Sequence, residues 1–142
     1  MLSGFKYLDH VTDAYVEAFG STIEEAFDQS ARGLINIMFD LNTINGRKPR
    51  TLCANGNDTI QLLYDWLEKT LWIIYTDSEI MSTFDVTISR SDSSILLEAK
   101  TLTESLDLEK HNYKTEVKGI TFHQMQVLEK KNRCVCKYIA DL

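Results

Sequence analysis

The chain lacks the features that mark secreted, membrane and redox proteins. No apolar run reaches the roughly 18 to 20 residues that a membrane span requires, and the first residues do not combine a basic and an apolar region as a secretory signal does. The cysteines are odd in number, and the closer pair, Cys134 and Cys136, lacks the C-x-x-C spacing of redox and zinc sites. We therefore expect a cytoplasmic protein with reduced thiols and no membrane partner.

Sequence motifs of common catalytic sites are also missing. The chain has no glycine-rich phosphate loop, no G-x-G-x-x-G after a strand and no G-x-S-x-G nucleophile elbow. Its histidines, His10, His111 and His123, are widely separated, which disfavours a zinc site. His10 and Asp13 could form an acid–base pair, but nothing beside them resembles an activated nucleophile. The sequence therefore predicts a protein that is not an enzyme.

Positive charge is scarce relative to negative charge. The chain has 15 Lys and Arg residues against 21 Asp and Glu residues, a net charge of −6, whereas a protein that binds nucleic acid by itself usually presents a basic face. Any RNA in its function is then expected to be held by a partner. Two basic trios fall where turns are expected, and we interpret them as solvated loop charge: Arg47, Lys48 and Arg50, and Lys130, Lys131 and Arg133.

The composition is that of a globular protein, and the first half of the chain has clear periodicity. The 142 residues, 44% of them hydrophobic, fit one domain over residues 1–142. The alternating segment Ala14–Phe19 predicts a strand, which Gly20 ends. Ser21 and Glu24 have the spacing of a capping box, and the apolar stripe that follows predicts a helix to about Asp40.

The remainder predicts a second helix and several strands. Asp58 caps a helix that runs from Thr59 to about Thr76, and Trp66, Trp72 and Tyr75 widen an apolar face that we assign to the core rather than to a partner surface. Alternating segments predict strands at 51–54, 84–89, 95–100, 116–128 and 134–139, with irregular chain at 106–114. The fold class is therefore α+β, a largely antiparallel β-sheet with two amphipathic helices packed on it.

Acidic groups at the two ends of the chain form a candidate metal site. Asp13 lies near the start, Asp141 is the penultimate residue and Leu142 supplies a terminal carboxylate. A fold that brings the ends together would gather three anionic groups, and a hard divalent cation would keep them all ionised. The alternative left open is that Asp13 is a turn or capping residue and Asp141 a frayed terminal one.

Four segments of the sequence carry a family resemblance. Residues 7–13, Y-L-D-H-V-T-D, are similar to a D/E-H-T-A-D motif, and residues 21–27, S-T-I-E-E-A-F, are similar to a capped T-L-E-E-A-F helix. Lys110-His111 with residues 116–123, E-V-K-G-I-T-F-H, resembles K-H followed by E-V-K-A-I-T-Y-H, and the ending Asp141-Leu142 matches a closing Asp and aliphatic residue. In this order and spacing, the motifs make the chain resemble the archease family over almost its whole length.

The resemblance implies a function for the chain. Archeases are accessory activators of the GTP-dependent tRNA-splicing RNA ligase; they promote guanylylation of the ligase and its multiple turnover. Family members bind a divalent cation, commonly calcium, at positions that correspond here to Asp13, Asp141 and Leu142. The implied partner is the catalytic subunit of the ligase, with RNA contacted only through it, and we expect a monomer.

The chain departs from the family pattern at several positions. Val11-Thr12 stands where the family has Thr-Ala, so the hydroxyl is displaced by one residue, and Gly119 and Phe122 replace Ala and Tyr. The resemblance implies positions near the metal or the ligase surface for four residues: His10, Lys118, Thr121 and His123. For Lys118, a solvated strand lysine is an equal alternative.

Two further function classes remain open from the sequence. One is a chaperone-like interaction module whose cation is purely structural, and the other is a metal-dependent phosphohydrolase. The first would lose stability and activity together when the cation is removed, and the second would show turnover without any ligase.

Overall fold

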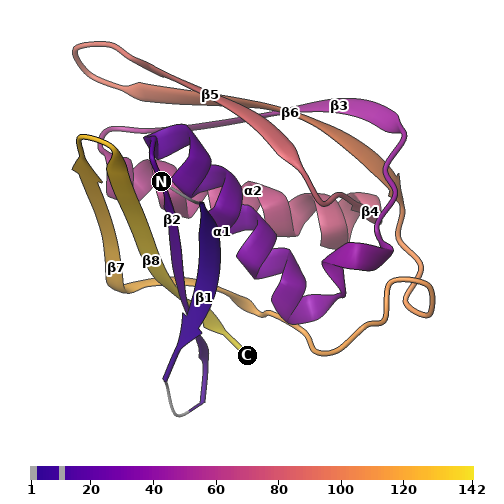
Figure 1. Cartoon of the computed structure of the whole chain (residues 1–142). Helices are drawn as coiled ribbons and strands as arrows, with labels where there is room; N and C mark the ends of the chain where they lie inside the picture. Colours follow the sequence, from indigo (N-terminus) through magenta and orange to yellow (C-terminus); the bar gives the residue numbers. More distant parts are fainter. Residues whose placement is uncertain (1–2, 10–11) are drawn as a thin grey trace.

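The computed structural model describes residues 3–9 and 12–142, which form two antiparallel sheets on either side of two helices (Figure 1). The first sheet has the strand order β1-β2-β8-β7. In the second, β6 pairs with β3 along one edge and with β5 and β4 along the other. The strands are β1 (Gly4–Leu8), β2 (Ala14–Gly20), β3 (Lys48–Gly56), β4 (Glu79–Ile80), β5 (Phe84–Arg90), β6 (Ile95–Ser105), β7 (Gly119–Lys130) and β8 (Arg133–Asp141).

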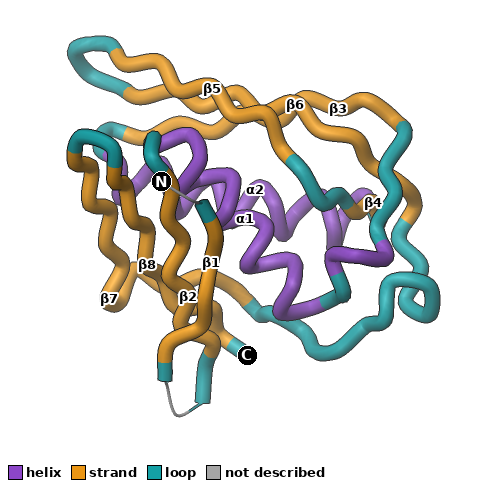
Figure 2. The backbone as a smooth tube through the Cα atoms, in the orientation of Figure 1, coloured by secondary structure: helices purple, strands orange, loops and turns teal. Residues whose placement is uncertain are grey.

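The helices are α1 (Ile23–Met38) and α2 (Thr59–Asp77), and they fill the space between the sheets (Figure 2). Helix α1 packs on β2 and β8 of the first sheet and on β5 of the second, while α2 packs on β3 and β7. The α+β class with a largely antiparallel arrangement and two helices is confirmed. The strands are divided between two sheets, and each helix packs against strands of both.

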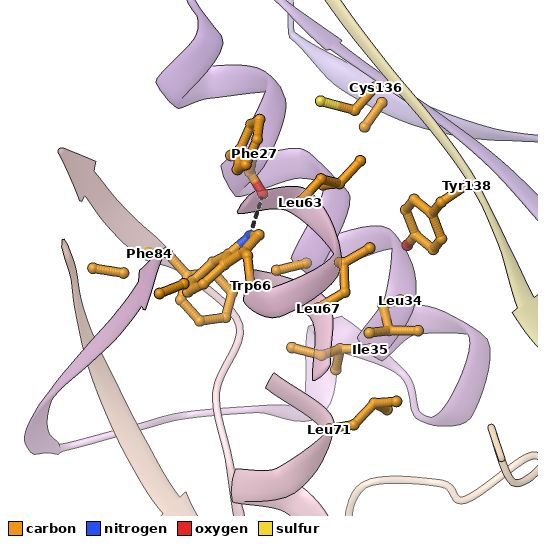
Figure 3. Packing of buried hydrophobic residues seen from close by; sticks show 14 of the residues in the cluster. Phe27, Leu34, Ile35, Leu63, Trp66, Leu67, Leu71, Phe84, Cys136 and Tyr138 are labelled. Carbon is orange, nitrogen blue, oxygen red and sulfur yellow. Dashed lines mark hydrogen bonds between the residues drawn. The ribbon is translucent and has the colours of Figure 1, made fainter. Parts of the chain in front are cut away.

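The centre of this interior is a cluster of large side chains without solvent exposure (Figure 3). Trp66 of α2 lies against α1, and its indole N–H donates to the carbonyl oxygen of Phe27 over 2.9 Å. The hydroxyl of Tyr138, on β8, donates to the carbonyl oxygen of Ser30 over 2.7 Å. Because buried polar groups are costly when unpaired, these two bonds let an indole and a phenol lie in an apolar interior.

The start of α1 differs from the sequence prediction by one residue. Thr22, not Ser21, is the N-cap, and its hydroxyl accepts the backbone N–H of Glu25 over 3.1 Å. The Glu25 carboxylate in turn accepts from the backbone N–H and the hydroxyl of Ser21, at 2.9 and 2.8 Å, and these bonds lower the pKa of Glu25. The predicted partner Glu24 belongs to the first turn but not to the cap.

The start of α2 was predicted correctly, whereas its aromatic face was predicted only in part. The Asp58 carboxylate accepts the backbone N–H of Gln61 over 2.8 Å. Trp66 is buried as expected, but Trp72 is 59% exposed and Tyr75 about half exposed. Tyr75 nonetheless accepts the backbone N–H of Val117 over 3.0 Å, tying the helix to the segment before β7. The assignment of Trp72 and Tyr75 to the core is therefore wrong.

The interpretation of the first basic trio as loop charge is also wrong for two of its members. Lys48 and Arg50 lie in β3 and pair with Glu79, at 3.0 and 2.8 Å, and Arg50 also pairs with Asp77 at 2.6 Å. Strands β1 and β4 had no counterpart in the sequence analysis. Within the described residues, neither helix is apolar enough over its length to cross a membrane.

Candidate functional site

The last strand of the chain ends between the first residues of two other strands. In the first sheet β8 is flanked by β2 and β7, and its register pairs Ala140 with Ala14 on one side and Asp141 with Gly119 on the other. Asp13 directly precedes β2, so it continues this register beside Asp141. The backbone N–H of Lys118 donates to the carbonyl oxygen of Asp141 over 2.7 Å, which extends the pairing by one residue.

A pocket of about 350 Å³ opens at this edge of the sheet. Two carboxylates, Asp13 and Asp141, line it, together with side chains and backbone from β7 and β8: Gly119, Ile120, Thr121, His123 and Ile139. Asp141 is exposed and Asp13 half-buried. The fold thus brings two of the predicted site residues, 128 positions apart in sequence, into one pocket.

Two more of the predicted residues belong to the same pocket through β7. The backbone N–H of His123 donates to the hydroxyl oxygen of Thr121 over 3.1 Å. That bond orients the Thr121 hydroxyl, which keeps its own proton to donate. The His123 ring is exposed, with Nε2 3.4 Å from the side-chain nitrogen of Gln124. Thr121 and His123 therefore surround the carboxylates with one hydroxyl and one imidazole.

The other predicted residues have different positions. Lys118 is exposed and adjoins the pocket through its backbone. Leu142 is half-buried, with its side chain packed against the core. His10, for which a role was predicted, and Val11 lie outside the described residues. Thr12, which carries the displaced hydroxyl, is exposed.

The oxygen atoms at the pocket are of the types that a hard cation binds. Calcium takes six to eight oxygen ligands from carboxylates, carbonyls, hydroxyls and water, and the pocket offers two carboxylates and the Thr121 hydroxyl. Among the described residues, no group of three or more His, Cys, Asp or Glu side chains could hold a metal by itself. A cation bound here would therefore need the terminal carboxylate, backbone oxygens or water to complete its coordination.

The second histidine of the motifs, His111, has a structural role away from this pocket. It is fully buried in the connection between β6 and β7; its Nδ1 accepts the backbone N–H of Asp107 over 3.0 Å, and its Nε2 lies 3.2 Å from a carboxylate oxygen of Glu104. Burial alone would raise the pKa of Glu104, but bonds from Lys110, the Asn45 backbone and His111 lower it to about 2. The backbone oxygen of His111 accepts from Asp40 beyond the end of α1, so this cluster anchors the connection to the helix.

The sequence analysis missed one feature beside the pocket, an aromatic pair. The ring of Phe122, between Thr121 and His123, stacks on that of Tyr64 in α2 with centroids 4.1 Å apart and planes inclined by 10°. Nothing in local periodicity indicates this contact, because it joins a strand to a helix 58 positions away.

Comparison with known proteins agrees with this architecture. The chain matches the archease protein family over residues 5–142. It is 31% identical to protein archease of Methanothermobacter thermautotrophicus, over 99% of this chain and 100% of that protein, and 33% identical to protein archease of Thermococcus gammatolerans, over 97% and 98%.

Two solved structures share the fold. The solution structure of Methanobacterium thermoautotrophicum protein 1598 superposes with a TM-score of 0.83 at 31% identity, covering 98% of this chain and 99% of that one. The crystal structure of a Thermotoga maritima archease, described as a possible chaperone, gives a TM-score of 0.53 at 17% identity over 96% of both chains, a likeness of fold alone. The chain is thus an α+β protein with a carboxylate pocket at its strand ends, and it belongs to the archease family.

Proposed function

We propose that this protein is an accessory activator of the GTP-dependent tRNA-splicing RNA ligase, promoting guanylylation of the ligase and its multiple turnover in tRNA splicing. The observation that supports this proposal is the convergence of Asp13 and Asp141 in one pocket, in a chain of the archease family. The net charge of −6 agrees with a role in which the ligase, not this chain, holds the RNA.

We also propose that the pocket takes a divalent cation, calcium being the best match, through Asp13, Asp141 and the terminal carboxylate of Leu142. When bound, the cation would offset repulsion between these carboxylates and hold the ends of β2 and β8 together. The Thr121 hydroxyl is oriented by its bond from the His123 backbone, so these two residues would keep a fixed geometry at the rim.

In this mechanism the chain contributes a rigid acidic surface rather than a reacting group. The strand ends around the pocket are fixed by the sheet register, and the exposed groups beside it, Lys118 and His123, would face the ligase. Docking of this surface at the ligase active site would position the groups that take part in guanylyl transfer. His10, which lies outside the described residues, is proposed for the same surface on the resemblance alone.

Labelled GTP provides the test of this proposal. The cognate ligase is carried through one round of ligation, and its guanylylation is measured with and without a substoichiometric amount of this protein. We expect restored guanylylation with the wild-type chain and loss of it with Asp13→Asn. Asp92→Asn is the matched control, because it removes the same charge from an exposed residue in the turn between β5 and β6, outside the pocket. A folded wild-type protein without effect on the ligase would contradict the proposal.

The cation has its own test in the protein alone. Because a ligand that binds only the folded state stabilises it, calcium should raise the Tm of the wild-type chain by several degrees, with a smaller rise, or none, for Asp13→Asn. Equal shifts for both proteins would exclude Asp13 as a ligand. Calorimetric titration with magnesium and manganese in place of calcium would then rank the metals.

A second candidate is a chaperone-like interaction module whose cation is purely structural. It is favoured by the description of the Thermotoga maritima relative as a possible chaperone and by exposed large side chains such as Trp72 and Phe122. In that case the Asp13→Asn variant would lose stability and activating capacity in proportion. A variant that keeps the Tm of the cation-loaded protein yet fails to activate the ligase would favour the direct role instead.

A further inference from the structure

Among the described residues, no third aromatic ring stacks on the pair formed by Tyr64 and Phe122 beside the pocket. Phe122 is stacked on Tyr64 at 4.1 Å, yet 54% of the residue remains exposed to solvent. The position of Tyr64 is fixed by a hydrogen bond, since its hydroxyl donates to the carboxylate of Glu68 over 3.2 Å. Burial and the neighbouring Glu68 carboxylate raise the pKa of Tyr64, so its hydroxyl is protonated and able to donate at neutral pH. The rings of Tyr64 and Phe122 therefore form a fixed platform, and the face of Phe122 that points away from Tyr64 is open to solvent.

An irregularity in β7 produces this platform. Between Thr121 and Gln126 the strand advances five residues, while its partner β8 moves only from Ile139 to Lys137, two residues. Gln124 takes a left-handed backbone conformation, with φ of 58°, to absorb the excess. The extra length lets Met125 enter the core while Phe122 lies outside against α2. Such irregularities re-aim side chains, and they recur beside functional sites.

Carboxylates are the charged groups that the structure connects to the platform. The Glu68 carboxylate accepts the hydroxyl of Tyr64, and the residues that flank Phe122 in sequence, Thr121 and His123, line the pocket that contains Asp13 and Asp141. The basic residues closest to Phe122 in sequence are Lys118 and His123, both of them exposed. With a net charge of −6 on the chain, this surface is matched to a cationic group more closely than to a phosphate.

A planar cation meets both requirements. The arginine guanidinium is flat and permanently charged; it stacks on aromatic faces and is less strongly hydrated than an ammonium group. A nucleobase would also stack, but its phosphates would then lie near the carboxylates. We propose that the open face of Phe122 binds the guanidinium of an arginine from the protein partner, as a third layer on the Tyr64–Phe122 platform. The contact deepens the proposed function, because the partner intended is the RNA ligase.

Binding of the ligase measures this contact directly. The Kd between the full chain and the purified ligase is compared for wild type, Phe122→Leu and Phe122→Tyr. Leucine keeps apolar bulk but removes the aromatic face, so we expect a Kd roughly tenfold higher, whereas tyrosine should bind like wild type. The control is Leu96→Ala, on the β5–β6 hairpin, because Leu96 is 55% exposed and lies outside the platform. An unchanged Kd for Phe122→Leu, or an equal loss for Leu96→Ala, would overturn the proposal.

The chemistry of the occupant is identified by cross-linking. A photoreactive benzoylphenylalanine at position 122 is irradiated in the complex of ligase, RNA and GTP. A cross-link to a ligase peptide that contains an arginine would support the proposal. Replacement of that arginine by lysine should then abolish the difference in Kd between the wild-type chain and Phe122→Leu. A cross-link to RNA or GTP would assign the platform to a nucleobase, and a ligase peptide without arginine would equally overturn it.

The two proposals fail in different ways. If the wild-type chain restores guanylylation and Phe122→Leu binds the ligase normally, the accessory role stands and the arginine contact does not. If the chain binds the ligase in a Phe122-dependent manner without restoring guanylylation, the contact stands and the activating role fails. Absence of any binding by the folded wild-type chain would overturn the contact as stated.

Discussion

The interior between the two sheets and the pocket at the strand ends are built on opposite principles. In the interior, Trp66 and Tyr138 are fully buried, and each places its polar atom on a backbone carbonyl. At the pocket, Asp13 and Asp141 bring like charges together at a partly exposed edge. The first arrangement stabilises the folded state, whereas the second is unfavourable by itself.

This difference separates stability from function within one small fold. The interior holds the helices and both sheets together, and through them the register that places the ends of β2, β7 and β8 side by side (Figure 1). The pocket residues, among them Asp13 and Asp141, then contribute little to folding and are available to bind a ligand or a partner. Substitutions in the interior should therefore change the free energy of unfolding, and substitutions in the pocket should change ligand and partner binding.

Trp66→Ala should have the largest effect on stability. The substitution removes the largest fully buried side chain and leaves the carbonyl of Phe27 without its indole donor. Loss of a buried tryptophan costs about 3–5 kcal/mol, a large fraction of the stability of a domain of this size. Urea denaturation would measure it. A loss below about 1 kcal/mol would mean that the interior is less important to the fold than its packing implies.

Tyr138→Phe should have a smaller effect in the same region. It removes only the hydroxyl that donates to Ser30, while the ring remains in place. The expected loss is about 1 kcal/mol, that of one buried hydrogen bond, because the Ser30 carbonyl lies within α1 and keeps its helical hydrogen bond. Since burial raises the pKa of Tyr138 far above its ordinary value, the loss should be the same at pH 7 and pH 9. A loss that shrinks at pH 9 would contradict this.

Asp28→Asn should act in the opposite direction and only above acidic pH. Burial raises the pKa of the Asp28 carboxyl from 3.8 to about 6, against the opposing effects of Arg32 and the Phe84 backbone N–H. Because the folded state binds this proton more tightly than the unfolded state, ionisation reduces stability as pH rises from about 4 to 6. The variant should therefore be more stable by roughly 1 kcal/mol at pH 7.5 and equal to wild type near pH 4. Thermal melts at both pH values check the sign.

Gly119→Ala should have the smallest effect on stability. The position lines the pocket, but an added Cβ meets no described atom within 4 Å, so we expect a change within about 0.5 kcal/mol. Gly20→Ala is the contrasting variant, since its Cβ would lie 2.4 Å from the Cβ of Glu25 at the cap of α1. Equal losses for the two glycines would remove the distinction between a tolerant rim and a packed interior.

The parts of the fold that depend on local pattern could be predicted from the sequence. Both helices have an apolar period and a capping residue, and the β5–β6 hairpin has clear alternation. The cap of α1 was displaced by one residue because Ser21–Glu24 and Thr22–Glu25 have the same spacing. Only the extended backbone of Thr22, with φ of −126° and ψ of 162°, selects the second.

Features that depend on tertiary pairing could not be predicted in this way. Strand β1 has weak alternation and is defined by its pairing with β2. The proximity of Asp13 and Asp141 follows from the register of β8 with β2, which no local pattern specifies; the motifs at the two ends indicated it through the family resemblance. The Tyr64–Phe122 stack requires the extra residues of β7, and a regular strand pattern gives no sign of them.

The central place of β8 in the first sheet also determines when that sheet can form during synthesis of the chain. Since β2 and β7 both pair with β8, the first sheet cannot close until residues 133–141 have left the ribosome, after β1 to β7 have been synthesised. The carboxylate pocket is therefore among the last parts of the molecule to assemble. A nascent chain stalled before β8 would lack Asp141 and the strand that joins β2 to β7, so it would have no surface competent for a cation or a partner.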